Sequence, residues 1–245
     1  MSIPVKSFYL STHEGFVGSD RYFEDFELDF PLDQITVILG ASGIGKSTLL
    51  KAILGDLPKT SLSVHSPFTR LAWMAQQDLL LPWLNVLDNV LLGALLRGEN
   101  KTVLRKKALD LLEKMGLKAW ATAKPFTLSG GMRQRVALAR TLMEDAPLIL
   151  MDEPFSALDS VNRYHLQNIA AEFLQSDTKK TVVMVTHDPK EALRLGHKIV
   201  ILGGFPARIH QTLFLDSPLP REISSPEILA REAQLLESLL KASGG

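Results

Sequence analysis

The sequence predicts an α/β fold with a mostly parallel sheet. Residues 35–39, 148–151 and 181–186 form short apolar runs that end at polar residues, as buried strands of a parallel sheet do. Apolar residues with helical spacing lie between these runs. Because strands that alternate with helices favour a parallel arrangement, we expect the carboxyl ends of these strands to meet at one edge of the sheet.

The expected helices are bounded by residues that start or stop helices. One helical pattern covers residues 101–115 and ends at a glycine, and two more cover residues 132–143 and 161–174. A last helix is expected from Ser225, which would cap it, with a proline in the first turn. A small β-turn unit is expected near residues 205–212.

Composition limits the classes of function. The chain has 245 residues, with 27 basic and 27 acidic side chains and no cysteine. A chain of this length can bury the core of one α/β domain, so we expect a single domain. The balanced charge gives no global positive field that would concentrate nucleic acid. The lack of cysteine excludes disulfides, thiolate catalysis and cysteine-ligated metal.

No membrane-spanning or targeting segment is expected. The first fifteen residues contain polar residues and a glutamate where a secretory signal needs an uninterrupted apolar stretch. The most apolar region, residues 79–96, carries Pro82, Asn85, Asp88 and Asn89, which are costly in hydrocarbon. We therefore expect a cytoplasmic protein.

A glycine-rich loop follows the first predicted strand and precedes a helical pattern. It fits the phosphate-loop pattern G-x-x-x-x-G-K-[ST] with the residues Gly40, Ala41, Ser42, Gly43, Ile44, Gly45, Lys46 and Ser47. Glycines let backbone N–H groups close around phosphate oxygens at the positive end of the helix. Lys46 is expected to contact the β and γ phosphates, Ser47 to bind Mg²⁺, and Thr48 to support the α phosphate.

The loop alone indicates only that a nucleoside triphosphate binds, which leaves kinases, GTPases, helicases and transport motors open. Two adjacent carboxylates, Asp152 and Glu153, end the second predicted strand. We expect Asp152 in the Mg²⁺ shell and Glu153 as the catalytic base that activates water. The alternative, a pair of solvent-facing acids at a strand end, is disfavoured beside a phosphate loop and with Pro154 fixing the exit from the strand.

Residues 128–135 read LSGGMRQR and resemble the signature LSGGQ-x-Q-R of the ABC superfamily, with Met132 in place of the usual glutamine. The resemblance implies a P-loop NTPase core with a mostly parallel sheet, an ABC-type helical subdomain and a small antiparallel β element. It implies one ABC ATPase domain over residues 1–245, with the helical subdomain at about 77–145. It also implies a homodimer that holds two ATP molecules, in which Ser129, Gly130, Gly131 and Asp159 contact the ATP of the opposing subunit.

Further segments resemble other motifs of the family. Residues 156–159 resemble the D-loop, and residues 185–188 resemble the switch-histidine segment. The resemblance implies that His187 contacts the γ phosphate or the attacking water. It also implies a Q-loop glutamine that reaches Mg²⁺, for which the register favours Gln76 over Gln77. The implied catalytic set is Glu153, His187 and Lys46, and the implied metal ligands are Ser47, Gln76 and Asp152.

Family members stack an aromatic residue near the N-terminus on adenine. By its distance from Lys46 we choose Phe16, ahead of Tyr9 and Tyr22. The family also has an aromatic residue before the Q-loop glutamine, where this sequence has Ala75.

Residues 81–90 read LPWLNVLDNV and resemble a stretch of the importers for nitrate, taurine, alkanesulfonates and pyrimidine precursors. The resemblance implies an ATP-hydrolysing subunit on the cytoplasmic side of the inner membrane, with two membrane-spanning permease subunits as partners. An extracytoplasmic solute-binding protein would act indirectly, and no nucleic acid is expected. Leu79, Leu80 and Trp83 are expected either to contact the permease or to pack in the core of the helical subdomain.

Two other functions are compatible with part of this pattern. The first is a soluble ABC ATPase that acts on nucleic acid or ribosomes, but such proteins usually carry long insertions or tandem halves. The second is a module that binds ATP without hydrolysing it, against which the intact Lys46, Glu153 and His187 argue. The transported solute is not encoded in this chain.

Overall fold

The computed structural model describes residues 7–57, 59–175 and 180–243. Its larger sheet has six strands in the order β5-β6-β7-β3-β8-β9. These strands are β3 (Ile35–Leu39), β5 (Leu71–Met74), β6 (Leu148–Asp152), β7 (Thr181–Thr186), β8 (Lys198–Gly203) and β9 (Arg208–Phe214). All neighbouring pairs are parallel except β8 and β9. The expectation of an α/β fold with a mostly parallel sheet is confirmed.

The three predicted strands are adjacent in this sheet. β6 pairs with β7, and β7 pairs with β3, so their carboxyl ends lie side by side. The expected β-turn unit is the antiparallel hairpin of β8 and β9. A one-residue extension of β6 beyond its expected end brings Asp152 into the strand.

A second sheet has three antiparallel strands in the order β2-β1-β4. These are β1 (Ser7–Val17), β2 (Asp20–Pro31) and β4 (Ser63–His65). In β2, Phe26, Leu28 and Phe30 are buried while Glu27 and Asp29 between them are exposed, the alternation expected of a half-buried strand. Its buried side packs on α1 (Lys46–Leu54) and on one face of the larger sheet.

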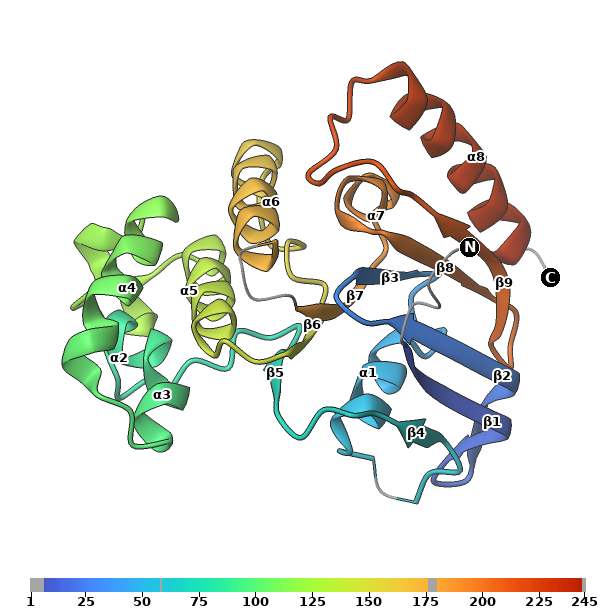
Figure 1. Cartoon of the computed structure of the whole chain (residues 1–245), viewed down its shortest axis with the longest axis horizontal. Coiled ribbons are helices and arrows are strands. Elements are labelled where there is room, and N and C mark those ends of the chain that lie inside the picture. Colours follow the sequence, from blue (N-terminus) through green and yellow to red (C-terminus); the bar gives the residue numbers. More distant parts are fainter. Residues whose placement is uncertain (1–6, 58, 176–179, 244–245) are drawn as a thin grey trace, which may run out of the picture.

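Four α-helices and two short 3-10 helices, Lys118–Trp120 and Pro125–Thr127, connect β5 to β6, and the α-helices form one end of the molecule, away from the antiparallel sheet (Figure 1). They are α2 (Val86–Val90), α3 (Leu92–Leu96), α4 (Lys101–Lys114) and α5 (Gly130–Met143). α5 begins two residues earlier than expected because Ser129 caps it: the Ser129 Oγ accepts a hydrogen bond from the Met132 N–H at 3.3 Å. The boundaries at 77 and 145 stay a prediction.

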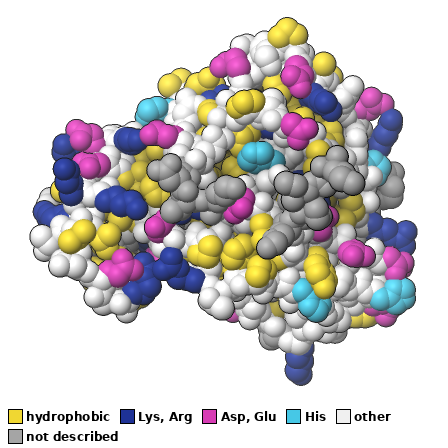
Figure 2. All heavy atoms as spheres, viewed as in Figure 1, with side chains coloured by type: hydrophobic (Ala, Val, Ile, Leu, Met, Phe, Trp, Pro, Cys, Tyr) yellow, Lys and Arg dark blue, Asp and Glu magenta, His cyan; other side chains and the backbone are white. Residues whose placement is uncertain are grey.

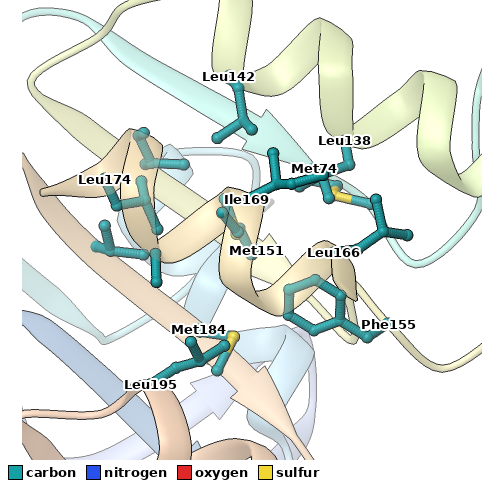
Figure 3. Packing of buried hydrophobic residues seen from close by; sticks show 14 of the residues in the cluster. Met74, Leu138, Leu142, Met151, Phe155, Leu166, Ile169, Leu174, Met184 and Leu195 are labelled. Atoms are coloured by element: carbon teal, nitrogen blue, oxygen red, sulfur yellow. The ribbon is translucent and has the colours of Figure 1, made fainter. Parts of the chain in front are cut away.

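The inner strands β3, β6 and β7 are buried along their whole length, which explains why they are apolar at nearly every position, whereas the edge strand β9 is polar and mostly exposed. Along β3, Val37 belongs to the core cluster under α5, α6 (Ser160–Leu174) and α7 (Pro189–Leu195), whereas Ile38 belongs to the cluster under α1. Figure 3 shows Leu138 from α5 and Leu166 from α6 close to Met151 of β6. The two helices therefore share one core with the strand that ends at Asp152.

The last helix, α8 (Pro226–Ser243), begins where the sequence predicts, with the Ser225 Oγ accepting a hydrogen bond from the Ile228 N–H at 3.4 Å. Basic and acidic side chains are interspersed over the face seen in Figure 2, in keeping with the balanced charge. Within the described ranges, no helix is both long enough and apolar enough to span a membrane.

Candidate functional site

The carboxyl ends of β3, β6 and β7 bring the predicted phosphate loop and the predicted catalytic residues together. A cavity of about 390 Å³ lies at this edge. It is lined by Tyr22, Ser42, Gly43, Gly45, Lys46, Ser47, Thr48, Gln76 and Glu153. Residues from four separate segments of the chain thus face one space, at the sheet edge where parallel strand order predicts a ligand site.

The glycine-rich loop has a conformation that only glycine adopts easily. Gly43 and Gly45 have φ values of 81° and 102°, in the left-handed region that favours glycine. A Cβ on Gly45 would also lie 2.9 Å from the Phe23 ring. Gly45 caps α1, whose first N–H groups have no partner within the helix. The loop and helix together present backbone donors to an anion.

Lys46 is held inside this loop and is only 5% exposed. Its Nζ donates hydrogen bonds to the carbonyl oxygens of Gly40 and Ala41, at 2.8 and 2.9 Å. Burial lowers the Lys46 pKa, and the negative charges of Glu153 and Asp152 oppose that shift. An ammonium has three N–H donors, so two carbonyl bonds leave a third for a phosphate oxygen.

Asp152 is 4% exposed, and its buried Oδ1 has no hydrogen-bond partner among the described residues. Burial raises the Asp152 pKa, a hydrogen bond with Ser47 lowers it, and the neighbouring charge of Glu153 raises it further. A buried carboxylate oxygen without a partner is costly unless a cation binds it. The Asp152 carboxylate and the Ser47 hydroxyl are oxygen donors that suit Mg²⁺.

Glu153 lies between His187, another predicted catalytic residue, and Gln76, a predicted metal ligand. Its Oε1 is 3.1 Å from His187 Nδ1, and its Oε2 accepts a hydrogen bond from Gln76 Nε2 at 3.5 Å. Glu153 has a φ of 48°, which is rare for a residue with a side chain and costs roughly 1–3 kcal/mol. The Glu153 N–H donates to the Val185 carbonyl at 2.9 Å. This strained turn aims the carboxylate at the cavity.

The predicted signature and D-loop residues do not line the cavity. Ser129 and Gly130 are exposed at the start of α5, and Asp159 is exposed at the start of α6. A Cβ on Gly131 would lie 3.5 Å from the carbonyl oxygen of Ala157, so the two segments are neighbours. We call Ser129, Gly130, Gly131 and Asp159 the signature surface. It forms a second, separate surface of the same chain.

The aromatic residue at the cavity is Tyr22, whereas Phe16 is not among the lining residues. Phe16 pairs with Arg21 across the β1–β2 hairpin, and its N–H donates to Ser61 Oγ at 2.9 Å. Tyr9 lies elsewhere, stacked on His65 with ring centroids 4.7 Å apart. Distance from Lys46 along the sequence ranks Tyr22 behind Phe16, because the position of Tyr22 in space depends on the turn of this hairpin.

Two arginines missed at the sequence level anchor the segment that follows Gln76. Arg140 of α5 donates to the carbonyl oxygens of Asp78 and Leu79, both at 2.8 Å. Arg133, one residue after Met132 in the signature, donates from Nε to the Asp78 carboxylate at 2.9 Å. Their spacing of seven residues places both on one face of the helix. The Gln76 segment is therefore tied to α5, which we call the signature helix because it begins with Gly130 and Gly131.

The apolar residues after Gln76 divide between core and surface. Leu80 is 9% exposed and belongs to the main core, whereas Leu79 is 55% and Trp83 68% exposed. A groove of about 240 Å³ lies beside Leu79 and Arg140, with Leu92 and Leu96 also lining it. Core packing, one of the two alternatives left by the sequence, thus applies to Leu80, whereas Leu79 and Trp83 lie on the surface.

Comparison with known proteins identifies the family. A family model described as ABC transporter matches residues 23–156. An uncharacterized ABC transporter ATP-binding protein of Haemophilus influenzae is 41% identical over 225 residues, which cover 89% of this chain and 92% of that protein. The chain belongs to the ABC transporter family. It carries the ATP-binding, ATPase domain of that family.

Other relatives are named for import. A taurine import ATP-binding protein of Rhizobium johnstonii is 42% identical over 195 residues, covering 77% of this chain and 74% of the relative. An aliphatic sulfonates import ATP-binding protein of Agrobacterium fabrum is 37% identical over 225 residues, covering 91% and 79%. These names favour a transport function over the nucleic-acid alternative.

Solved structures of ABC cassettes share the fold. A dimeric bacterial ABC transporter cassette has a TM-score of 0.74 and 29% identity, covering 86% of this chain and 99% of that chain. A dimeric post-hydrolysis state bound to ADP and Pi has a TM-score of 0.72 and 28% identity, with the same coverage. The expected core, helical region and small antiparallel sheet are all present.

Proposed function

We propose that this chain is the ATP-hydrolysing subunit of an ABC importer and works as a homodimer on two membrane-spanning permease subunits. The observation that carries the proposal is the Glu153 carboxylate, which is held between His187 and Gln76 at the rim of a cavity formed by a phosphate loop. A carboxylate in that position can take a proton from a water molecule that attacks the γ phosphate.

In this proposal the phosphate loop binds the ATP phosphates. Lys46 contacts the β and γ phosphates with its ammonium, and Ser47 and Thr48 face the same space from the first turn of α1. Gly40, Ala41, Ser42, Gly43, Ile44 and Gly45 supply the backbone. Phe16 stays the proposed adenine contact, and Tyr22, on the same hairpin, contacts the nucleotide nearer its phosphates.

Mg²⁺ is the proposed metal, held by Ser47, Asp152 and Gln76. When bound, it neutralises charge on the β and γ phosphates. The buried Oδ1 of Asp152, which has no hydrogen-bond partner within the described residues, supports this assignment.

The proposed hydrolysis step uses residues already in contact. Glu153 accepts the proton of the attacking water, while His187 and Gln76 hold the Glu153 carboxylate in place and contact the γ phosphate or the water. A bent, left-handed backbone at Glu153 fixes its side chain relative to Val185. The chain thereby orders the base before the nucleotide reacts.

The signature surface is proposed to complete the site of a second copy. Ser129 and Gly130 begin α5, so their surroundings favour an anion, yet they lie outside the phosphate cavity of their own chain. Related cassettes have been solved as dimers. Two copies placed head to tail would give each phosphate cavity one signature surface.

The exposed Leu79 and Trp83 are proposed to contact the permease on the cytoplasmic side of the inner membrane. Arg140 and Arg133 tie the adjacent segment to the signature helix. Closure of the dimer around ATP would then move this surface and drive the permease, and hydrolysis would reopen it. A solute-binding protein outside the membrane would supply the solute.

The solute class supported by the relatives is a small sulfonate, such as taurine or an alkanesulfonate. Uptake of labelled taurine and of an alkanesulfonate by cells that carry the wild-type or the Lys46→Ala chain tests this assignment. Loss of either uptake in the variant is expected. Unchanged uptake of both would remove sulfonates from the proposal.

The hydrolytic function is tested by Mg²⁺-dependent ATPase activity of the wild type, Glu153→Gln and Glu172→Gln. Glu172 is an exposed glutamate that pairs with Lys114 on the helical side, so it is a matched control. Glu153→Gln is expected to lower the turnover number by about 10²- to 10⁴-fold while still binding ATP. Normal hydrolysis by Glu153→Gln would refute Glu153 as the base.

A further inference from the structure

Arg163 joins the D-loop segment to the segment that carries His187. Arg163 lies in the first turn of α6, and Asp159, four residues before it, caps that helix. Its Nη2 donates to the Leu158 carbonyl at 3.0 Å, and its Nη1 donates to the Asp188 carboxylate at 3.2 Å. One planar guanidinium therefore bridges two loops that are separate in sequence.

On the far side of this bridge, Asp188 is bonded into the loop that presents His187. The Asp188 N–H donates to Thr186 Oγ1 at 3.0 Å, and the other Asp188 oxygen caps α7 by accepting from the Lys190 N–H at 2.8 Å. His187 lies between Thr186 and Asp188 and contacts Glu153. A shift of the Asp188 carboxylate would therefore move the His187 ring, which contacts the proposed base Glu153.

A buried glutamate completes the cluster behind His187. Glu191 is 3% exposed, and its Oε2 accepts a hydrogen bond from Thr186 Oγ1 at 2.7 Å. The Arg163 Nε is buried and has no hydrogen-bond partner in the described part of the chain, while Glu191 Oε1 lies 3.7 Å away. That separation is just beyond a hydrogen bond. The guanidinium can therefore form this bond with only a small movement.

We propose that Arg163 is a positioning residue that transmits the placement of the signature surface, through Asp188 and Glu191, to His187. The inference rests on the proposed function, because it gives Asp159 a contact with a second copy. When that contact shifts the Leu158–Asp159 segment, Arg163 moves with it and changes the position of the His187 loop. Dimer closure and readiness for hydrolysis are thereby linked within one subunit.

Two substitutions disrupt the bridge but keep the charge of Arg163 or the helix cap made by Asp188. Arg163→Lys keeps the positive charge but loses the planar fork that reaches two partners at once. Asp188→Asn keeps the helix cap, since asparagine caps as well as aspartate, but loses the carboxylate. Arg97→Met is the control: the Arg97 side chain is 30% exposed, against 32% for Arg163, and also pairs with two carboxylates.

The experiment measures ATP affinity, turnover number and thermal midpoint for wild type, the two single variants, their double variant and the control. We expect Arg163→Lys and Asp188→Asn each to lower the turnover number about tenfold, with ATP affinity within about twofold of the wild type. The double variant should lose no more turnover than the more damaging of the two single variants, because both substitutions act through one bridge. Arg97→Met should keep wild-type turnover.

Four results would overturn the inference. Unchanged turnover in well-folded Arg163→Lys and Asp188→Asn would show that the bridge has no effect on hydrolysis. Additive losses in the double variant, or losses that follow a fall in thermal midpoint, would show a merely structural tie. A wild-type chain that hydrolyses no ATP would overturn the proposed function as well, whereas an active wild type with unaffected variants would overturn this inference alone.

Discussion

The phosphate cavity and the signature surface, which are both proposed to face phosphate, differ in burial and in bonding. In the cavity, Lys46 and Asp152 are 5% and 4% exposed, and Asp152 keeps a buried oxygen without a protein partner among the described residues. On the signature surface, Ser129 and Asp159 are exposed, and each caps its own helix. In the proposed function, the first region binds ATP within its own chain, and the second closes over the ATP of another copy.

This difference suggests a division of labour between binding and hydrolysis. Variants in the cavity should alter ATP affinity in a single chain. Variants of the signature surface should leave that affinity intact and act only when a second copy is present.

Outside the catalytic base itself, the largest effect is expected from Gly130→Glu. A Cβ on Gly130 has open space around it, with Arg133 the nearest contact at 3.9 Å, and an acid in the first turn favours a helix. The variant should therefore fold, but its carboxylate would repel the ATP of the opposing subunit. We expect turnover to fall by about 10²- to 10³-fold with little change in ATP affinity. A loss of ATP affinity in Gly130→Glu would show instead that the signature surface contributes to the ATP site of its own chain.

A smaller effect, on ATP affinity rather than on turnover, is expected from Lys46→Ala. A hydrogen bond to a charged group is worth about 1.5–3 kcal/mol, so ATP affinity should fall roughly 10- to 100-fold. Calorimetric titration with ATP, with Lys51→Ala as the control, measures this change. Lys51 is an exposed lysine in the last turn of the same helix. Equal affinity in Lys46→Ala and wild type would refute the phosphate contact.

A pH-dependent effect on stability is expected from Glu191→Gln. Burial raises the pKa of Glu191 from 4.5 to about 7; the hydrogen bond from Thr186 opposes the shift, the charge of Asp188 adds to it, and the charges of Arg163 and His187 oppose it. Because the folded chain holds this proton more tightly than the unfolded chain, its contribution to stability is full below pH 4.5. It is lost as the pH rises through about 7.

Glutamine stays neutral at every pH, so Glu191→Gln should gain unfolding free energy relative to the wild type between pH 4.5 and 7. Above that window the difference should be constant. Urea unfolding at pH 5 and pH 8, with the exposed Glu172→Gln as control, measures it. A difference that is the same at both pH values would contradict the raised pKa.

The smallest effect on the isolated chain is expected from Trp83→Glu. Trp83 is 68% exposed, so the thermal midpoint and the basal ATPase activity should stay near wild type, with a stability change within about 0.5 kcal/mol. Capture of the permease subunits from detergent-solubilised membranes should be lost. Partial unfolding of the variant would instead place Trp83 in the core.

Sequence alone predicted the parts of the fold that depend on short patterns. The strands at residues 35–39 and 181–186, the phosphate loop and the acids after residue 151 follow from local apolar runs and motif spacing. Parallel strand order then predicts that Glu153 and His187 meet, and they do, at 3.1 Å. Local pattern and one topological rule were sufficient for this part of the site.

The remaining contacts depend on tertiary distance, which no local pattern encodes. The presence of Tyr22 at the cavity depends on the turn and irregular register of the β1–β2 hairpin, which shifts between Gly15 and Phe16. The bridge made by Arg163 joins residues 25 positions apart. An apolar run such as the one near Trp83 also does not indicate which of its residues face solvent.

The central claim is that two copies of this chain form each complete ATP site. The most direct measurement is Mg²⁺-dependent ATPase activity per subunit over a range of protein concentrations, together with the size of Glu153→Gln with and without ATP. The account predicts that activity per subunit rises with concentration and that ATP converts Glu153→Gln from monomer to dimer. Constant activity per subunit at concentrations where the chain is a monomer would contradict it.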